Sequence, residues 1–178
     1  GDRSWAVASS ISIDNEAYRI GTGVPAESES GQRIMRRDGE TVSQSDIGRL
    51  FSASWITPSM DGIFTDSPGT RRRFLDRQVI AFDAAHIGRT NRYEKMLRER
   101  NTLLAEGRGD AAWFAAIEAS LAASAVAVTA ARQSLITDLN AEAGAGWHGF
   151  PGVQLTLGGE VEGWLDTMSA LDAEDRFI

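Results

Sequence analysis

The fold of this chain is decided by the stretch Ser54-Trp55-Ile56-Thr57-Pro58-Ser59-Met60-Asp61-Gly62-Ile63-Phe64. We call it the junction segment (residues 54–64), because the sequence before it is typical of short strands and the sequence after it of long helices. Residues 51–56 form an apolar stretch that predicts a strand. Pro58 lacks the N–H that a central strand needs, but its fixed φ suits the first turn of a helix. Thr57 is expected to cap that helix, and Asp61 to lie in its first turn near the positive end of the helix dipole.

Upstream of the junction segment, residues 4–42 predict an antiparallel meander. Apolar and small polar side chains alternate with a period of two, which is typical of half-buried strands. The expected strands cover residues 5–13, 17–23, 32–36 and 40–42. Asp38-Gly39 is a strong signal for a type I′ hairpin between the last two. Ser43 or Ser45 is expected to cap a short helix that ends at Leu50.

Downstream, the apolar period becomes helical. The expected helices are one of about three turns that contains Phe74, Ile80 and Phe82, followed by helices over residues 86–106, 111–141 and 160–178. A strand over residues 153–157 is expected before the last helix. Gly107 suits the end of one long helix and Asp110 the cap of the next, so these two helices should form an antiparallel hairpin.

The fold class predicted from these elements is α+β, an antiparallel β meander followed by a mostly helical lobe with a long antiparallel helical hairpin. Its expected parts are a β-rich lobe over residues 1–66, a helical lobe or arm over 67–145, and a return strand with an acidic helix over 146–178. The sequence starts inside a predicted strand and carries no signal peptide pattern, so we expect a piece of a longer protein.

Composition excludes several classes of protein. The chain has 178 residues, of which 42% are hydrophobic and 24% charged, which is ordinary for a soluble globular protein. It contains no uninterrupted run of about 18 apolar residues, so no membrane span is expected. Cysteine is absent, which rules out disulfides and thiolate metal sites and fits a reducing compartment, the cytoplasm.

Charge is distributed unevenly along the chain. The net charge of −7 combines −4 over residues 1–70, +5 over residues 71–109 and −8 over residues 110–178. A basic island in an acidic protein indicates local binding of a phosphate backbone rather than general binding of polyanions. Arg71-Arg72-Arg73 begins this island, and arginine presents a planar donor fork that suits phosphate. The alternative is that these arginines form internal ion pairs with Asp66, Asp76 or Asp83.

Motifs of known chemistry are missing. The sequence has no phosphate-binding Gly-x-x-x-x-Gly-Lys-Ser/Thr loop, no nucleophile elbow and no histidine or aspartate pattern for a metal. No catalytic residue, metal site or cofactor is therefore expected for this chain alone, which should be inactive as an enzyme. His86 and His148 are expected at the surface or in capping positions.

Several separated motifs resemble those of the RecF family of bacterial recombination-repair proteins, relatives of ABC and SMC ATPases. The most specific is Arg71-Arg72-x-Phe74-Leu75-Asp76. The others, in chain order, are Arg36-Arg37-Asp38-Gly39, Trp55-Ile56-Thr57-Pro58 followed by Asp61 and Phe64, Tyr93 with Arg98-x-Arg100-Asn101-x-Leu103-Leu104, and Phe150-Pro151 followed by Leu155-x-Leu157-x-Gly159. The resemblance covers nearly the whole chain.

The resemblance implies a central fragment of an ABC/SMC-like head that lacks the Walker A region and the C-terminal signature and Walker B regions. The full-length protein would bind ATP and Mg²⁺ as a homodimer. It would bind gapped DNA or single-strand–double-strand junctions and act with the partner proteins RecO and RecR in recombinase loading. It would take part in DNA repair, replication, recombination and the SOS response.

The resemblance also assigns site residues. It places Thr57, Pro58 and Asp61 at the periphery of the ATP site, in the segment that senses the γ-phosphate in related ATPases. This stretch lacks the glutamine that is usual there, so helix capping is the expected role of Asp61. DNA contacts are expected from Arg71, Arg72, Arg73 and Arg77. The alternative function is a non-catalytic helical module of another SMC-like ATPase, in which the arm serves only to dimerise or to dock a partner.

Overall fold

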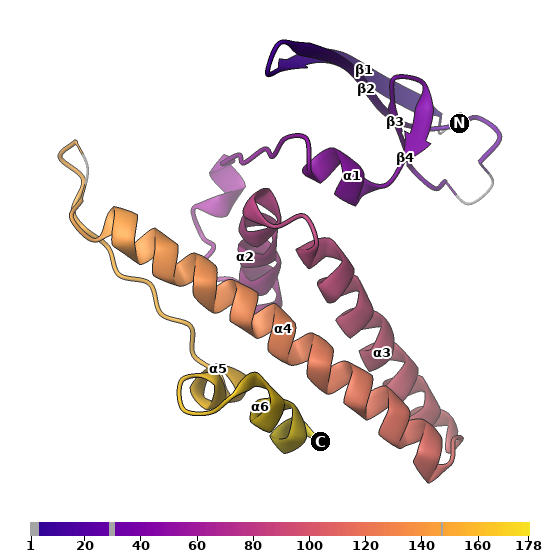
Figure 1. Cartoon of the computed structure of the whole chain (residues 1–178), viewed down its shortest axis with the longest axis vertical. Helices are drawn as coiled ribbons and strands as arrows, with labels where there is room; N and C mark the ends of the chain where they lie inside the picture. Colours follow the sequence, from indigo (N-terminus) through magenta and orange to yellow (C-terminus); the bar gives the residue numbers. More distant parts are fainter. Residues whose placement is uncertain (1–3, 29–30, 147) are drawn as a thin grey trace. The chain divides into compact units, whose positions relative to one another are not determined.

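The computed structural model describes residues 4–28, 31–146 and 148–178 (Figure 1). The chain forms two compact units, Gly1–Ala53 and Ser54–Ile178. The first contains the sheet and the second contains the long helices, so the α+β fold class is confirmed. The three-part division at residues 66 and 145 refers to lobes of a longer protein and stays a prediction.

A four-stranded antiparallel sheet makes up most of the first unit. Its strands are β1 (Trp5–Ile13), β2 (Glu16–Val24), β3 (Ile34–Arg37) and β4 (Glu40–Val42). They are hydrogen-bonded in chain order, which confirms the predicted meander. Asp38 and Gly39 have φ values of 53° and 93°, as a type I′ hairpin requires. The Asp38 carboxylate Oδ1 also accepts a hydrogen bond from the backbone N–H of Arg19 at 2.8 Å.

β1 is an edge strand with exposed apolar side chains: Trp5 is 46% and Val7 61% exposed. Helix α1 (Gln44–Gly48) follows the sheet. The Ser43 Oγ accepts a hydrogen bond from the Asp46 backbone N–H at 3.1 Å, and Asp46 Oδ2 accepts one from the Ser43 N–H at 3.0 Å. This capping box confirms Ser43 as the cap of a short helix.

The junction segment differs from its prediction in two ways. Residues 51–56 are not a strand; instead, the Ser54 hydroxyl donates to Gln78 Oε1 at 3.0 Å, so side chains rather than a β ladder attach this stretch. Pro58 does start a helix, but η1 (Pro58–Met60) is a single 3₁₀ turn. Asp61 therefore lies at the C-terminal end of η1, and its predicted place in the first turn of a helix is wrong.

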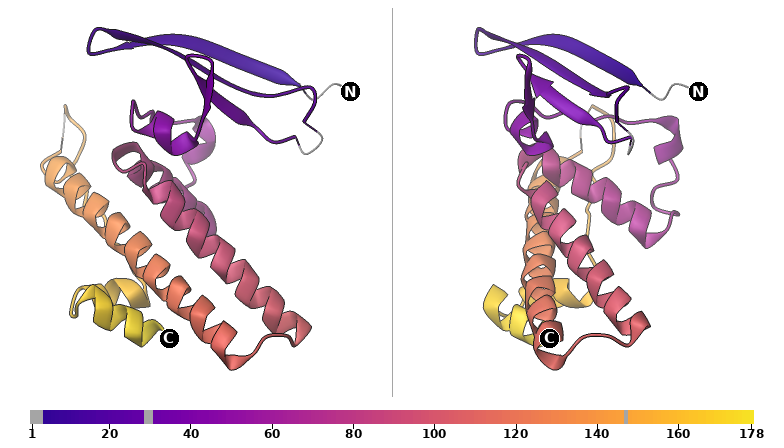
Figure 2. Two further views of the ribbon diagram at one scale, coloured as in Figure 1. Left: turned by 45° about the vertical axis from the view of Figure 1, so that its right-hand side comes forward. Right: turned by 90° about the vertical axis from the view of Figure 1, so that its right-hand side faces the viewer.

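The second unit is built around one long helix, α4 (Ala111–Ala143). It packs against α2 (Pro68–Phe82), α3 (His86–Glu106), α5 (Glu160–Leu165) and α6 (Ala170–Phe177). Figure 2 shows α3 and α4 side by side along their length, joined at one end, which confirms the predicted hairpin. Gly107 ends α3 in the left-handed region with φ 61°, and Asp110 Oδ1 accepts from the Trp113 N–H at 2.8 Å to cap α4.

The return segment (residues 148–159) runs back beside α4 without forming the predicted strand over 153–157 (Figure 1). The side chain of Asn140 attaches it, because Nδ2 donates to the Leu155 carbonyl at 2.9 Å and Oδ1 accepts from the Leu155 N–H at 2.7 Å. The Val153 N–H also donates to the Ala143 carbonyl at the end of α4, at 3.2 Å. The predicted helix over 160–178 is also divided. Ser169 starts α6 by accepting from the Asp172 N–H at 3.2 Å, so α5 and α6 are separate helices.

Helix α4 is long and apolar enough, by length and composition, to cross a membrane, with a mean hydropathy of 1.7 over its most apolar window. The core helix of a soluble protein meets the same criterion. Here 44% of that window is buried, and the buried side chains of α4 as a whole include Leu121, Val126 and Leu135. The expectation based on uninterrupted apolar runs thus overlooked a helix whose apolar stretches are separated by small polar residues and a few charged ones, such as Glu118.

Candidate nucleic-acid interface

The N-terminal turns of α2 present the three predicted arginines. Ser67 caps the helix, its Oγ accepting from the Thr70 N–H at 3.2 Å, and Pro68 occupies the first helical position. Arg71, Arg72 and Arg73 follow directly and are all exposed. The sequence therefore places three guanidinium groups around the start of a regular helix.

The charges of these arginines are not neutralised within the described part of the chain. The Arg71 guanidinium donates to the Asp66 backbone carbonyl, and Arg73 Nη2 donates to Thr70 Oγ1 at 3.2 Å. Both acceptors are uncharged oxygens. The predicted internal ion pairs with the Asp66, Asp76 and Asp83 carboxylates are not formed, and this alternative is wrong. The start of α2 is thus a surface with uncompensated positive charge.

Arg77, one turn further along α2, lies in a different environment. Its guanidinium carbon lies 4.9 Å from the centre of the Trp55 ring and 5.4 Å from that of Phe74, within the range of cation–π attraction. Its Nη2 lies 3.9 Å from the Met60 sulfur, and its Nε is buried without a hydrogen-bond partner among the described residues. This side chain fastens the junction segment to α2.

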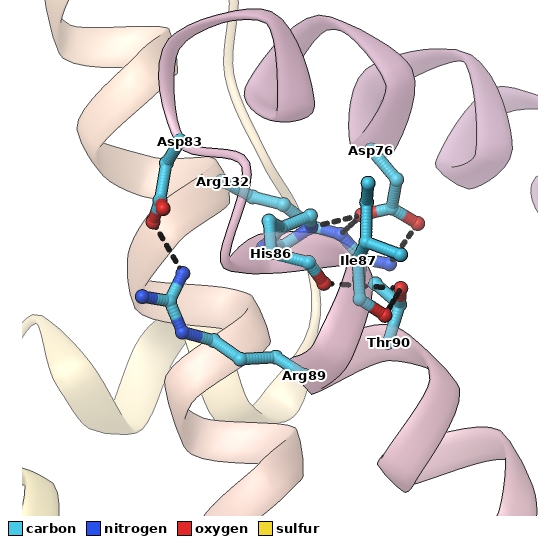
Figure 3. Close-up of polar contacts among 7 residues, drawn as sticks. All are labelled: Asp76, Asp83, His86, Ile87, Arg89, Thr90 and Arg132. Atoms are coloured by element: carbon cyan, nitrogen blue, oxygen red, sulfur yellow. Dashed lines mark hydrogen bonds and ion pairs between the residues drawn. The ribbon is translucent and has the colours of Figure 1, made fainter. Parts of the chain in front are cut away.

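A buried ionic network joins three helices at Asp76 (Figure 3). Arg132 of α4 donates from Nε to Asp76 Oδ1 and from Nη2 to Asp76 Oδ2, both at 2.8 Å. His86, at the start of α3, contacts Asp76 Oδ1 through Nε2 at 2.9 Å. The three side chains are 0% (His86), 13% (Arg132) and 16% (Asp76) exposed. We call this the Asp76 network (Asp76, His86 and Arg132).

Electrostatics in the Asp76 network favour the ionised carboxylate. Burial alone would raise the pKa of Asp76, but the hydrogen bonds from His86 and Arg132 and the charge of Arg132 outweigh it, so this pKa lies below its ordinary value. Because the carboxylate only accepts hydrogen bonds, His86 Nε2 carries the proton. His86 Nδ1 is buried with no partner among the described residues. The predicted surface position of His86 is therefore wrong.

Sequence reasoning missed Arg132 altogether. It lies in the apolar middle of α4, where an arginine is rarely buried without a carboxylate partner. That signal was readable, because Asp76 is the one acidic residue of α2 and Asp83 follows directly at its C-terminal end. A second pair lies beside the network: Arg89 Nη1 donates to Asp83 Oδ2 at 2.5 Å, and this hydrogen bond lowers the pKa of Asp83 (Figure 3).

The residues predicted at the ATP-site periphery all lie in or beside η1. Pro58 begins this turn, Asp61 ends it and is exposed, and the Thr57 N–H donates to the Met60 sulfur at 3.4 Å. In the part of the chain that the structure describes, no group of three or more His, Asp or Glu residues could hold a metal ion.

Comparison with known proteins identifies relatives along nearly the whole chain. The DNA replication and repair protein RecF of Mesorhizobium japonicum is 37% identical over 184 aligned residues, which cover 99% of this chain and 48% of that protein. RecF of Allorhizobium ampelinum is 40% identical, over 89% of this chain and 43% of that protein. RecF of Brucella suis is 39% identical, over 89% and 41%. No family model matches the chain.

Solved structures agree in fold. The recombination mediator protein RecF in its ATPrS form, described as part of the RecFOR pathway, matches with a TM-score of 0.68 at 20% identity, covering 80% of this chain and 39% of that one. Its ATP form matches with a TM-score of 0.66 at 18% identity. The chain spans about half the length of the curated relatives it matches. With sequence identity close to 40% along nearly its entire length, the chain is a homologue of the RecF DNA replication and repair proteins.

Proposed function

We propose that this chain is part of a RecF-type, ATP-dependent DNA-binding protein that acts in recombinational repair and replication restart. Its DNA would be gapped or contain a single-strand–double-strand junction, and the full-length protein would help to load recombinase. The single observation that carries this proposal is the surface of uncompensated guanidinium groups at Arg71–Arg73, in a homologue of RecF. Such groups release counterions from a phosphate backbone and position a protein on DNA.

The four predicted arginines take different roles in this proposal. Arg71, Arg72 and Arg73 are exposed, so they would contact phosphates directly. Arg77 is engaged with Trp55 and Phe74. It would act on DNA only by fixing the junction segment against the helix that carries the other three.

The junction segment supports a further part of the proposal. We place Thr57, Pro58 and Asp61 at the periphery of the ATP site of the full-length protein. Solved RecF structures that match this fold carry ATP or ATPrS in their names. We also propose that the full-length protein binds ATP and Mg²⁺, forms a homodimer, acts with the partners RecO and RecR and is located in the cytoplasm. The chain alone should not hydrolyse ATP, and turnover at a normal enzymatic rate would contradict this.

DNA binding is tested by fluorescence anisotropy of a labelled gapped duplex, titrated with the chain at several salt concentrations. The double variant Arg71→Gln, Arg72→Gln should bind more weakly. Its plot of log affinity against log salt should flatten by about 1.8, because each lost phosphate contact removes about 0.9 from the slope.

A matched control removes two positive charges elsewhere. Arg49 and Arg108 are exposed and paired with Asp46 and Glu106, so Arg49→Gln, Arg108→Gln lowers the net charge equally. This variant should keep the wild-type slope. Equal losses in both double variants would show only an effect of total charge. Unchanged binding by the Arg71, Arg72 variant with lower thermal stability would assign these arginines to the fold.

A second candidate function is an interaction module, and the free end of the α3–α4 hairpin favours it. Leu104 is 53% and Trp113 45% exposed there, and exposed aromatic side chains are frequent in protein interfaces. A mass that rises with concentration in sedimentation equilibrium, without DNA affinity at low salt, would support this module over the DNA-binding proposal. The variant Trp113→Ser should then abolish the self-association.

A further inference from the structure

A groove separates the first two turns of α3 from the middle of α4. Its volume is about 350 Å³. Its lining includes the small residues Gly88 and Ala123, and its polar lining comes from Arg89, Arg92, Ser120 and Ser124. A Cβ atom added at Gly88 would meet nothing within 4 Å, so there is open space at this point.

The positively charged side of the groove belongs to α3. Arg89 and Arg92 are three residues apart, which puts them on one face of the helix. Arg92 is exposed, and among the described residues no carboxylate pairs with it. Arg89 donates from Nη1 to Asp83, which fixes its position, while no other acceptor is found for its Nε and Nη2 groups in the described chain. The groove therefore carries net positive charge with free donors.

The α4 side supplies hydroxyl groups. Ser120 and Ser124 are four residues apart, again on one face. The Ser124 hydroxyl donates to the Ser120 carbonyl at 2.8 Å, which leaves its own lone pairs free. The Ser120 hydroxyl has no hydrogen-bond acceptor among the described residues, so it can donate to a ligand. No carboxylate belongs to the lining of this groove.

We propose that the groove between α3 and α4 binds a phosphate group. Two guanidinium forks and a hydroxyl donor match a tetrahedral anion with several acceptor oxygens better than a planar carboxylate. The phosphate can belong to a nucleic-acid backbone or to a nucleotide, because both offer the same oxygens. Only the nucleic-acid source rests on the proposed function.

The test is a titration of the ¹⁵N-labelled chain with inorganic phosphate at constant ionic strength, followed by amide shifts. The amides of Gly88, Ala123 and Ala127 should shift saturably. Arg92→Gln should weaken the affinity by about tenfold, since a charge-assisted hydrogen bond is lost. Lys95→Gln removes the same charge from an exposed position of α3 outside the groove lining and should leave the affinity unchanged.

A second variant fills the groove without changing charge. Gly88→Leu has room for its side chain and a higher helix propensity than glycine, so it should fold and lose phosphate binding. Groove amides that do not shift saturably, or that titrate alike in wild type, Arg92→Gln and Gly88→Leu, would overturn the proposal.

Competition identifies the source. A duplex oligonucleotide that displaces phosphate from the groove assigns a nucleic-acid backbone, and displacement by ATP assigns a nucleotide.

The outcomes also separate this inference from the DNA-binding proposal. Phosphate binding in the groove without DNA affinity at low salt supports the groove and contradicts the proposed function. DNA binding that depends on Arg71 and Arg72, with groove amides that do not respond to phosphate, supports the proposed function and contradicts the phosphate-binding groove.

Discussion

Asp76 joins three helices through its two carboxylate oxygens, one shared by His86 and Arg132 and the other held by Arg132 alone. It lies on α2 only three residues after Arg73, the last of the exposed arginines. The Asp76 network therefore fixes the helix that presents these arginines onto α3 and α4. The buried side chain of Asp76 thus helps to hold in place the helix that carries Arg71, Arg72 and Arg73.

The first prediction concerns this carboxylate. Asp76→Asn should lower the free energy of unfolding by about 3 kcal/mol, because Arg132 is 13% exposed and would keep a buried, unpaired charge. Urea denaturation followed by circular dichroism measures this.

Glu94→Gln is the control, since Glu94 pairs with Arg98 at the surface with 58% of its side chain exposed. It should change stability by less than about 0.5 kcal/mol. Equal effects would contradict the role of the network.

The second prediction concerns pH. The pKa of Asp76 in the folded chain lies below its ordinary value of 3.8. Its stabilising contribution is therefore fully present above that value and is lost as the pH falls through the folded pKa. Unfolding free energies measured between about pH 5 and pH 2 should fall less steeply for Asp76→Asn than for wild type. Parallel curves would show that other carboxylates, such as Asp83 and Asp46, account for the acid sensitivity.

Residue roles were only partly readable from the sequence. The exposed arginines followed from composition and motif. Arg77, in the same basic island, is held by Trp55 and Phe74, which requires knowing how the junction segment folds back on α2. His86 was misplaced at the surface, because burial of a polar residue at a helix start depends on partners outside its own helix. Its partner Asp76 lies on α2 and is itself paired with Arg132, which is 56 residues away from Asp76 in sequence.

At the level of elements, local rules predicted helices well and isolated strands poorly. The bounds of α3 and the caps of α1 and α4 follow from neighbouring residues, and they are confirmed. The stretches predicted as strands over 51–56 and 153–157 do not form strands, because a strand needs a partner that its own sequence does not specify. Ser54 and Asn140 show what replaces the ladder, namely side-chain hydrogen bonds to Gln78 and Leu155.

The third prediction concerns the turn of the α3–α4 hairpin. Gly107 has φ 61° and donates from its N–H to the carbonyl groups at the end of α3. Gly107→Ala should cost about 1 kcal/mol of unfolding free energy, because an L side chain disfavours this conformation. Gly88→Ala, in the first turns of the same helix with open space at its Cβ, should be neutral or stabilising by up to about 1 kcal/mol. Thermal denaturation of both variants checks the difference in sign.

At the level of the whole molecule, the two units differ in how much core they contain. Among the described residues, the buried apolar side chains of the second unit come mainly from α4, with Val79, Leu103 and Ala173 from its neighbours. The first unit contributes only Ile47 to this set. A four-stranded sheet whose β1 is largely exposed buries little apolar surface, so its stability is expected to be low.

The fourth prediction follows from this difference. Residues 54–178 alone should fold and unfold cooperatively on heating, with the helical circular dichroism expected from α2 to α6. Residues 1–53 alone should show no cooperative transition. Hydrogen exchange of the whole chain provides a second measurement, in which α4 amides should exchange slowest and β1 amides fastest. A cooperative transition for residues 1–53 would contradict this account of the cores.

Asn140 sets a narrow chemical requirement on one position of the sequence. Its amide both donates to and accepts from the backbone of Leu155, much as a neighbouring strand would. Aspartate offers the acceptor without the donor, serine is too short to provide both, and glutamine carries the same amide one methylene further out. Only asparagine can form both hydrogen bonds at this reach, so any substitution of Asn140 should leave the Val153 N–H to Ala143 carbonyl hydrogen bond as the remaining backbone tie between the return segment and the end of α4.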